Sequence, residues 1–468
     1  MRKIFGLLSV AALTFVLAAC EKSSDDRQSE AVITSFSIGD FKMIFNDITI
    51  DGKDTVAVST VSGTTVKFSI DQQHNLIFNS DSLPVGSQLD SVTTKISGAG
   101  TFTIRKTRKD GTTFDTLWTD KSLLNLTKPL IITVTSNDDS YVRQYTLKTN
   151  VHVCDPDSMS WRRLPDTLPA SLRNMRAIAL NEDILVYGLD GDGNPSLLSH
   201  PLKGNGGWSG PKSCQGLDKD ARCESVTLHN GILAMLDGGR IMTSDNGTEW
   251  KEAGNDLQIS YLFPFPQTGD GGTAWAVTAN GWIACSTDLA AWTKVQEVPE
   301  SFPIAEINGL CYPLSSNESI LRYVIAGIDT KLNPEHSEIW TKLSTEKIWT
   351  KIETAGNHSL PCPSLSMLSV IQYDGDLYAF GGKGRLNGSD IAPLRSFYQS
   401  SDNGITWRDC SAFFNSFNTW NRFMKFPAEL QGCSDAFCYI VDKYNNIWII
   451  TDGDTGVWRG YINRLFSK

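Results

Sequence analysis

The sequence predicts an all-β protein: an N-terminal β-sandwich followed by a six-bladed β-propeller that is closed by an N-terminal outer strand. Between about residues 31 and 153, apolar and polar residues alternate in short runs such as 64–70 and 101–105, which is typical of half-buried strands. From Trp161 onward, tryptophans that follow turn-like segments recur 42 to 58 residues apart, the range of propeller blades. Helical or doubly wound folds fit this spacing poorly.

The clearest strand pair of the first region is the hairpin predicted over 130–151. Ile132 and Val134 on one strand and Tyr145 and Leu147 on the other share one face, and the chain turns at 137–140. Frequent turns and a period of two indicate sheets with one buried face each. We therefore expect a sandwich over residues 31–153.

The second region, 154–468, contains six strand patterns that end in small residues. They lie at 183–191, 231–239, 273–281, 322–329, 376–382 and 446–453. Each resembles a kelch strand to some degree, and six such strands predict six blades. Seven tryptophans bound these intervals, so one lies outside a complete blade. We expect segment 159–164 to form the outermost strand of the last blade, paired with strands from 437–463, because such closure hides strand edges.

Turns that precede the tryptophans share a motif. SSDNGITW (400–407) and TSDNGTEW (243–250) are complete copies, and STDLAAW (286–292) is one residue shorter. The motif resembles the Asp-box of sialidases and of many other propellers. We expect its carboxylate to accept backbone N–H groups, its glycine to permit a positive φ and its indole to be buried. Recurrence with graded loss indicates a structural role for Asp245, Gly247, Trp250, Asp288, Trp292, Asp402, Gly404 and Trp407.

The N-terminus has the anatomy of an export signal. Two basic residues precede a short apolar run, and residues 17–20 read LAAC. This resembles the lipobox of bacterial lipoproteins, which implies a signal peptide at 1–19 and lipidation of Cys20. The acidic tether at 20–30 resembles the export signal of Bacteroidetes surface lipoproteins. We expect an outer-membrane, lipid-anchored protein that faces the exterior, with the periplasmic leaflet as the alternative.

Composition excludes several function classes. A net charge of −10 without a Lys/Arg cluster argues against nucleic acid as a partner. The scattered His and Cys show no metal-ligand spacing, so we expect neither a metal nor another cofactor. Lipidation of one of the ten cysteines would leave nine. Cys214 with Cys223, and Cys433 with Cys438, are close in sequence, but their pairing stays open.

Candidate catalytic residues are few. Arg176 could imitate the first arginine of a sialidase, although the Arg-Ile-Pro motif is missing. Glu224 and Glu306 stand at the starts of inner strands, where their side chains can face the central channel. Glycosidases need two positioned carboxylates, and these two form a candidate pair. A structural ion pair explains Arg176 equally well.

Candidate ligand-binding residues lie in long loops on the face opposite the Asp-box turns. The longest loops are 328–337, 381–393, which contains Arg385, and 411–432. The last brings Phe417, Trp420, Asn421 and Arg422 together, and aromatic faces beside an amide and a guanidinium suit sugar rings or protein contacts. The alternative is a small satellite core under the loop.

Over its full length, the chain resembles a family of Bacteroidetes surface lipoproteins with a cadherin- or Ig-like sandwich and an Asp-box, kelch-like propeller. The resemblance implies the architecture but carries no functional residue. We expect a surface-anchored, non-catalytic module that binds a glycan or an outer-membrane protein. The alternatives are a carbohydrate-active hydrolase or lyase, and a structural subunit of an uptake or adhesion complex.

Overall fold

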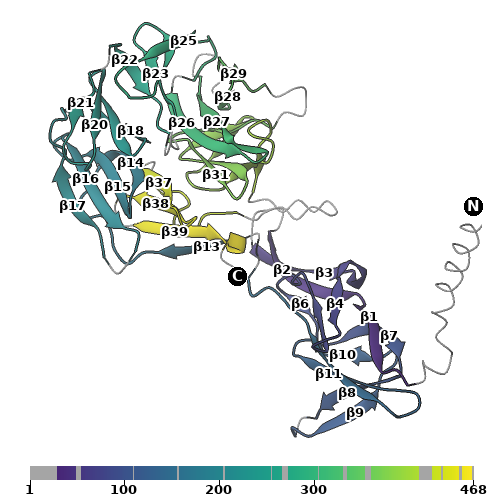
Figure 1. Ribbon diagram of the computed structural model, residues 1–468. Helices are drawn as coiled ribbons and strands as arrows, with labels where there is room; N and C mark the ends of the chain where they lie inside the picture. Colours follow the sequence, from purple (N-terminus) through teal and green to yellow (C-terminus); the bar gives the residue numbers. More distant parts are fainter. Residues whose placement is uncertain are drawn as a thin grey trace, which may run out of the picture. The chain divides into compact units, whose positions relative to one another are not determined.

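The computed structural model describes residues 29–48, 54–108, 110–154, 156, 158–203, 206–254, 256–265, 272–303, 305–329, 335–353, 360–410, 424–433, 436–452 and 456–465 (Figure 1). Within these ranges the regular elements are strands and two 3-10 helices, η1 (Gly63–Thr65) and η2 (Asn463–Leu465). No helix there is long and apolar enough to cross a membrane. The predicted signal peptide and Cys20 lie outside the described residues. The chain divides into two compact units after residue 155.

The N-terminal unit is a β-sandwich of three sheets. Their strands, in spatial order, are β1 (Val32–Ile38), β7 (Val92–Ala99) and β10 (Leu123–Leu124); β4 (Phe68–Asp71), β5 (Leu76–Asn79), β12 (Val142–Lys148), β11 (Leu130–Thr135), β8 (Thr101–Thr107) and β9 (Thr113–Leu117); and β3 (Asp54–Val61), β2 (Phe41–Ile48) and β6 (Ser87–Gln88). The predicted hairpin is β11–β12, in which Ile132 pairs with Tyr145 and Leu130 with Leu147.

The period-two pattern accounts for the core of this unit. Ile132, Val134, Tyr145 and Leu147 are at most 1% exposed, and they pack with side chains of β1 and β7. The backbone N–H of Ile33 donates to the Tyr145 hydroxyl at 3.3 Å, which satisfies the polar end of that buried ring. Apolar side chains on one face of each strand therefore hold the sheets together.

The C-terminal unit is a propeller of six four-stranded blades within the described residues. Numbered along the chain, they are blade 1, β14 (Arg173–Leu180), β15 (Asp183–Leu189), β16 (Pro195–Pro201) and β17 (Ser209–Ser213); blade 2, β18 (Ala221–His229), β19 (Ile232–Asp237), β20 (Arg240–Ser244) and β21 (Lys251–Glu252); blade 3, β22 (Ile259–Leu262), β23 (Ala274–Thr278), β24 (Trp282–Ser286) and β25 (Thr293–Glu297); blade 4, β26 (Ala305–Leu314), β27 (Asn317–Ile328), β28 (Glu338–Leu343) and β29 (Thr350–Lys351); blade 5, β31 (Ser369–Tyr373), β32 (Asp376–Phe380), β35 (Tyr398–Ser400) and β36 (Arg408–Asp409); and blade 6, β37 (Phe437–Val441), β38 (Ile447–Thr451), β39 (Val457–Ile462) and β13 (Met159–Arg163). Figure 1 shows them following one another around the ring, from teal through green to yellow.

The six strand patterns identified in the sequence are the second strands of the six blades, so the predicted blade count is confirmed. Each second strand is apolar on both faces because neighbouring blades cover it. One example is Tyr323 of β27, which packs edge to face against Trp275 of β23 with ring centroids 6.0 Å apart. Blade 5 also carries a small sheet of β30 (Ser364–Leu365), β33 (Gly384–Leu386) and β34 (Ser389–Ile391).

The predicted ring closure is also confirmed. β13 is the outermost strand of blade 6 and pairs antiparallel with β39, with Trp161 opposite Gly460. The indole N–H of Trp161 donates to the Lys425 carbonyl at 3.0 Å, and its ring lies 5.4 Å from that of Phe426. The first and last segments of the propeller are thus joined by strand pairing and by an aromatic contact.

Cys214, Cys223 and Cys438 are free thiols, so neither of the two pairs that are close in sequence forms a disulfide. Cys214 and Cys223 are buried in the same apolar cluster between blades 1 and 2. Burial raises the pKa of Cys214 and of Cys438 to about 12, so both thiols are protonated at neutral pH. These cysteines act as small apolar side chains.

Candidate functional site

Four consecutive blades interrupt the pairing of their innermost strand near its start. The register shifts between Arg173 and Arg176 in β14, and between Arg222 and Thr227 in β18. It shifts again next to Tyr261 in β22, and ahead of Asn308 in β26. Such bulges bend a strand and re-aim its side chains, and they are common beside functional sites.

The three sequence-predicted catalytic candidates share one neighbourhood as a result. Burial raises the pKa of Tyr261, the charge of Arg176 lowers it, and the charges of Glu224 and Glu306 raise it. Arg222 adds a second positive charge on this side of the ring. The charges of arginine and carboxylate side chains from blades 1, 2 and 4 therefore act on a tyrosine from blade 3.

Two of these charged groups are held by the backbone of other blades. Arg176 donates to the Pro264 carbonyl at 2.9 Å and lies 5.8 Å from the ring centroid of Tyr439. Glu306, at a positive φ of 50°, accepts the N–H of Met367 at 2.6 Å. A non-glycine residue in this conformation is strained and persists only where its surroundings hold it.

Tyr261 is a poor nucleophile in this setting. Its hydroxyl donates to the Ile307 carbonyl at 3.2 Å, and its raised pKa keeps the proton on the oxygen at neutral pH. Tyr439 is similar: burial raises its pKa, while it donates to the Val370 carbonyl at 3.3 Å. The hydrogen bonds of Arg176, Glu306, Tyr261 and Tyr439 consequently hold neighbouring parts of the propeller together, and neither tyrosine is prepared for a reaction.

The turns with the repeated tryptophan lie between the third and fourth strands of their blades. Asp402 accepts the Thr406 N–H at 2.8 Å, and Asp288 accepts the N–H groups of Ala290 and Ala291 at 3.0 and 2.9 Å. The indole of Trp407 donates to the Gly404 carbonyl at 3.0 Å, and Gly404 has a φ of 101°. These contacts close the turns without involving a ligand.

One residue expected in these turns does not have the expected contacts. In the 243–250 turn, the Asn246 amide oxygen accepts the N–H groups of Thr248 and Glu249 at 3.0 and 2.9 Å. The exposed Asp245 next to it is one position early, because this turn has two residues between its capping serine, Ser244, and Gly247, whereas the 400–407 turn has three between Ser400 and Gly404. The expectation for Asp245 is therefore corrected, whereas Gly247 and Trp250 lie as expected. In the 286–292 turn, Leu289 takes the glycine position at a φ of 67° and Trp292 is buried.

The predicted aromatic loop falls largely outside the described residues. Phe417, Trp420, Asn421 and Arg422 are not described, and their role stays a prediction. Phe426, at the end of the loop, is 1% exposed and stacks on Phe397 with centroids 4.2 Å apart. For this ring the satellite-core alternative holds.

Arg385, the remaining predicted ligand-binding residue, is engaged within the chain. It forms ion pairs with Glu335 at 2.9 Å and Asp390 at 3.5 Å. Glu335 also accepts the N–H of Gly388 at 2.9 Å. The Arg385 side chain therefore ties the β33–β34 hairpin to the chain just ahead of β28.

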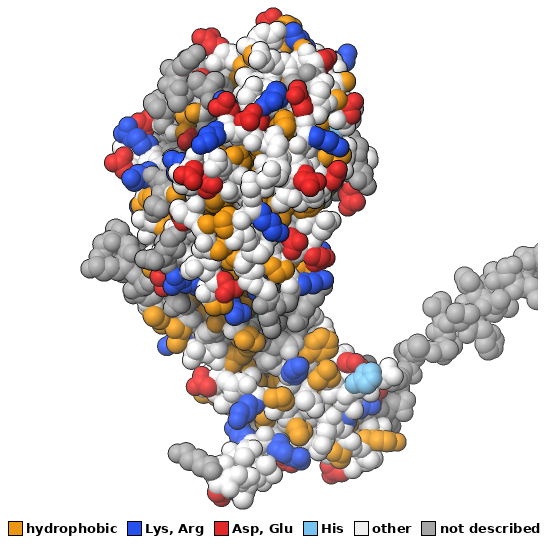
Figure 2. Space-filling model, turned by 90° about the vertical axis from the view of Figure 1, so that its left-hand side faces the viewer, with side chains coloured by type: hydrophobic (Ala, Val, Ile, Leu, Met, Phe, Trp, Pro, Cys, Tyr) orange, Lys and Arg blue, Asp and Glu red, His pale blue; other side chains and the backbone are white. Residues whose placement is uncertain are grey.

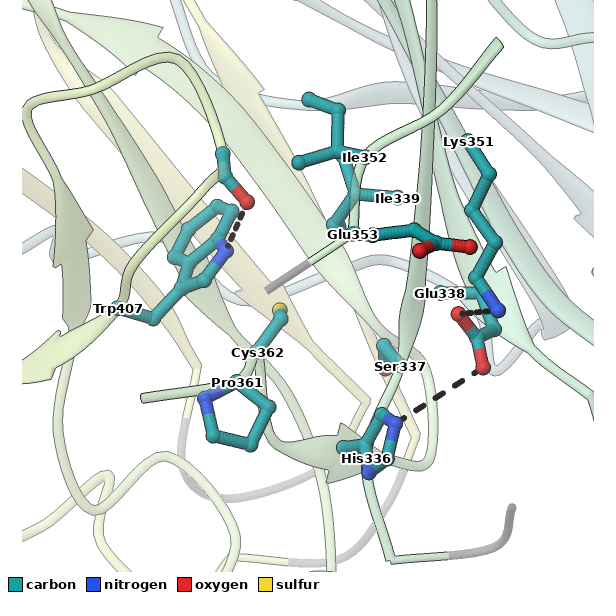
Figure 3. Close-up of a pocket in the computed structure, with 11 residues that line it drawn as sticks. His336, Ser337, Glu338, Ile339, Lys351, Ile352, Glu353, Pro361, Cys362 and Trp407 are labelled. Carbon is teal, nitrogen blue, oxygen red and sulfur yellow. Dashed lines mark hydrogen bonds and ion pairs between the residues drawn. The ribbon is translucent and has the colours of Figure 1, made fainter. Parts of the chain in front are cut away.

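A cavity of about 210 Å³ lies between the outer strands of blade 4 and the 400–407 turn of blade 5 (Figure 3). Four titratable side chains line one side: His336, Glu338, Lys351 and Glu353. The rest of the lining is mostly apolar and includes Ile352, Pro361, Cys362 and Trp407. The hollow thus places polar groups that could orient a ligand beside apolar side chains that could contact it.

The charged wall contains a buried ion pair. The Glu338 side chain is 7% exposed, and its Oε2 lies 2.9 Å from the Lys351 Nζ. Its Oε1 faces the ring of His336 at 3.8 Å. Glu353 is exposed and forms no hydrogen bond or ion pair within the described part of the chain. This wall offers both donors and acceptors to a ligand.

Cys362 beside His336 does not form a nucleophilic pair. Burial raises the pKa of the Cys362 thiol, with a smaller opposing effect from Ser337, so the thiolate is scarce at neutral pH. Sequence reasoning missed this cavity, because its walls come from segments 336–339, 351–353, 361–362 and 404–407 that no local motif connects. Trp407 was recognised only for its structural role.

Two family models match the chain. The "DUF6242 beta propeller domain" covers residues 155–468, and the N-terminal domain of the same family covers residues 36–149. The chain belongs to the DUF6242 family. A search of the curated proteins found no match to this DUF6242 chain.

Several solved structures are similar to this DUF6242 chain at low identity. A Trichoderma reesei carbohydrate-active enzyme of family AA12 is 9% identical, with a TM-score of 0.39, and the match covers 65% of this chain and 96% of that one. The SapL1 lectin in complex with alpha methyl fucoside is 11% identical (TM-score 0.35; 60% and 90% covered), and a PL25 ulvan lyase 9% identical (TM-score 0.34; 64% and 96% covered). With TM-scores below 0.5, these likenesses carry no argument about function.

The surface of this DUF6242 chain mixes both signs of charge. On the face shown in Figure 2, the described acidic and basic side chains alternate over the propeller without forming a large region of one sign. Groups of three or more His, Cys, Asp or Glu that could hold a metal ion are not found among the described residues.

Proposed function

We propose that this chain is a lipid-anchored binding module of the outer cell surface, whose propeller captures a glycan or protein group and catalyses no reaction. The observation that carries the proposal is the cavity of Figure 3, in which Lys351, Glu338 and Glu353 keep donors and acceptors that no other residue of the described chain uses. The anchoring part rests on the LAAC sequence that ends at Cys20.

The protonation states favour binding over catalysis. Burial raises the pKa of Tyr261 in the channel and of Cys362 in the cavity, so neither is a ready nucleophile at neutral pH. Glu306 is committed to the Met367 N–H. Nucleophilic catalysis needs the opposite, a lowered pKa or an adjacent activating base.

A binding screen tests the proposal. The full chain without residues 1–19 would be applied to glycan arrays and to immobilised surface extracts. Glu353→Gln, which keeps the size of the side chain, should reduce capture if the cavity binds the ligand. If Trp420→Ala abolishes capture and Glu353→Gln does not, the site is the 411–432 loop, and the cavity does not carry the function.

Carbohydrate-active catalysis is the second candidate, favoured by the bulges that gather Glu224, Glu306 and Arg176 near Tyr261. Incubation with polysaccharides, followed by detection of new reducing ends or unsaturated products, tests it. Turnover that is lost in both Glu224→Gln and Glu306→Gln would replace the binding proposal. A stable complex with an outer-membrane protein, insensitive to glycans, would favour the third alternative, a structural subunit.

Localisation is tested separately from binding. Wild-type chain should fractionate with membranes and be cleaved by protease added to intact cells. Cys20→Ala should release it from the membrane fraction. Membrane association that resists protease would place it on the periplasmic leaflet instead.

A further inference from the structure

We infer that the cavity beside blade 4 binds one neutral sugar ring through two adjacent hydroxyl groups, one bonded to Glu338 and the other to Lys351. The inference rests on the proposed binding function and specifies its ligand. It starts from the hydrogen-bonding capacity that the ion pair leaves unused.

The ion pair uses only part of each partner. Lys351 Nζ forms an ion pair with Glu338 Oε2 at 2.9 Å, which leaves at least two of its three N–H groups. Glu338 Oε1 has only the His336 ring, at 3.8 Å, which is beyond hydrogen-bond length. Because Glu338 is largely buried, its Oε1 requires a hydrogen-bond donor, and the absence of that hydrogen bond would cost free energy. The ligand or water that fills the cavity must therefore donate to Glu338 and accept from Lys351.

This pairing of demands excludes ligands whose polar groups can only donate or only accept hydrogen bonds. An ammonium group cannot accept from Lys351, since it has donors only. An ionised carboxylate cannot donate to Glu338, and it would be repelled by both Glu338 and Glu353. A hydroxyl does both, and two hydroxyls on adjacent ring carbons lie side by side, as the ammonium and the carboxylate do here. Glu353, at the rim, can accept from a third hydroxyl.

The opposite wall and the volume restrict the ligand further. Pro361 and Trp407 lie on the other side of the cavity from Lys351 and Glu338, and Ile352 lies beside Glu353 between them (Figure 3). The Trp407 N–H is not available, because it donates to the Gly404 carbonyl. C–H groups of a sugar ring suit such a surface. A volume of about 210 Å³ has room for roughly seven waters at about 30 Å³ each, which is enough for one sugar ring.

Ligand-observed NMR with the full chain, without residues 1–19, tests the inference. The probes are methyl glycosides of the common neutral hexoses, glucuronic acid as an anion, glucosamine as a cation and propionamide as a stand-in for a protein amide. We expect saturable binding of at least one neutral methyl glycoside. Lys351→Met should weaken it at least tenfold, and Glu353→Gln, which loses the charge but keeps an acceptor oxygen, should weaken it by a smaller factor. Lys347→Met and Glu318→Gln, exposed residues of the same blade outside the cavity, are the matched controls and should bind like wild type.

The outcomes separate the inference from the proposed function. If glucuronic acid, glucosamine or propionamide binds more tightly, and the same two variants weaken that binding, the sugar inference is wrong and the cavity still binds a ligand. If no probe binds, or if a bound probe is unaffected by Lys351→Met and Glu353→Gln, both the inference and the cavity-based function fail. Thermal unfolding of each variant shows whether lost binding reflects lost folding, and Glu353→Gln, at an exposed position, should unfold like wild type.

Discussion

The side-chain amide of Asn308 in blade 4 donates a hydrogen bond of 2.7 Å to the hydroxyl of Tyr439 in blade 6. The same hydroxyl donates to the Val370 carbonyl of blade 5, which lies between them in the ring. One oxygen atom thus joins three blades. Asn308 is 2% exposed, so its amide has no access to bulk water if that partner is lost.

Tyr439→Phe should destabilise the propeller by about 1–3 kcal/mol, because it leaves a buried amide without its acceptor while keeping the ring. Urea unfolding followed by tryptophan fluorescence measures the change. Tyr444→Phe is the control, since that hydroxyl bonds Glu182 at the surface, and a change within about 0.5 kcal/mol is expected. Equal effects of the two variants would show that the hydrogen bond between Asn308 and Tyr439 does not matter.

In the 243–250 turn, Asn246→Ala should cost about 1–2 kcal/mol, because two backbone N–H groups lose their acceptor. Asp245→Ala, at the adjacent exposed position, should change stability by no more than about 0.5 kcal/mol. The free energies of unfolding of the two variants show whether Asn246, as in the structure, or Asp245, as in the sequence motif, caps the turn. A larger loss in Asp245→Ala would restore the alignment that places the aspartate in the capping position.

A feature could be predicted from the sequence when the residues that form it are close together in the chain or recur at a regular spacing. Blade number, the second strands and the β13 closure were predictable, since each depends on local apolar runs or on a tryptophan spacing. The identity of the capping residue was not, because Asp245 and Asn246 both suit such turns and only the backbone distinguishes them. The cavity was out of reach, because Glu338 and Trp407 become neighbours only through the packing of blade 4 against blade 5.

The turn of blade 5 should be sensitive to acid. Burial raises the pKa of Asp402, but hydrogen bonds from Thr406 and Ser400 outweigh this and hold it below the usual 3.8. A carboxyl whose pKa is lowered by folding contributes stability above its unfolded pKa, and this contribution is lost as pH falls through the folded pKa. Asp402→Asn, which cannot ionise, should therefore be less stable than wild type at about pH 7, and the difference should shrink below the usual pKa. A difference that stays constant to about pH 2 would contradict this assignment.

The closing strand offers a test by non-additivity. Trp161 lies opposite Gly460, and a Cβ built on Gly460 would be 2.4 Å from the indole Cε3, with the next nearest atoms also in Trp161. Trp161→Ala should cost about 2–4 kcal/mol through lost packing against Phe397 and Phe426. Gly460→Ala should cost about 1–3 kcal/mol by displacing the indole.

Because the three atoms nearest the added methyl group all belong to that indole, Gly460→Ala should cost little once Trp161 is already alanine. The double-mutant cycle, measured by urea unfolding, should show a coupling above about 1 kcal/mol. Arg162→Ala, exposed on the same strand, replaces Trp161→Ala in the control cycle and should add to Gly460→Ala without coupling. Simple additivity in both cycles would mean that the indole does not rest on Gly460, and that strand pairing alone closes the ring.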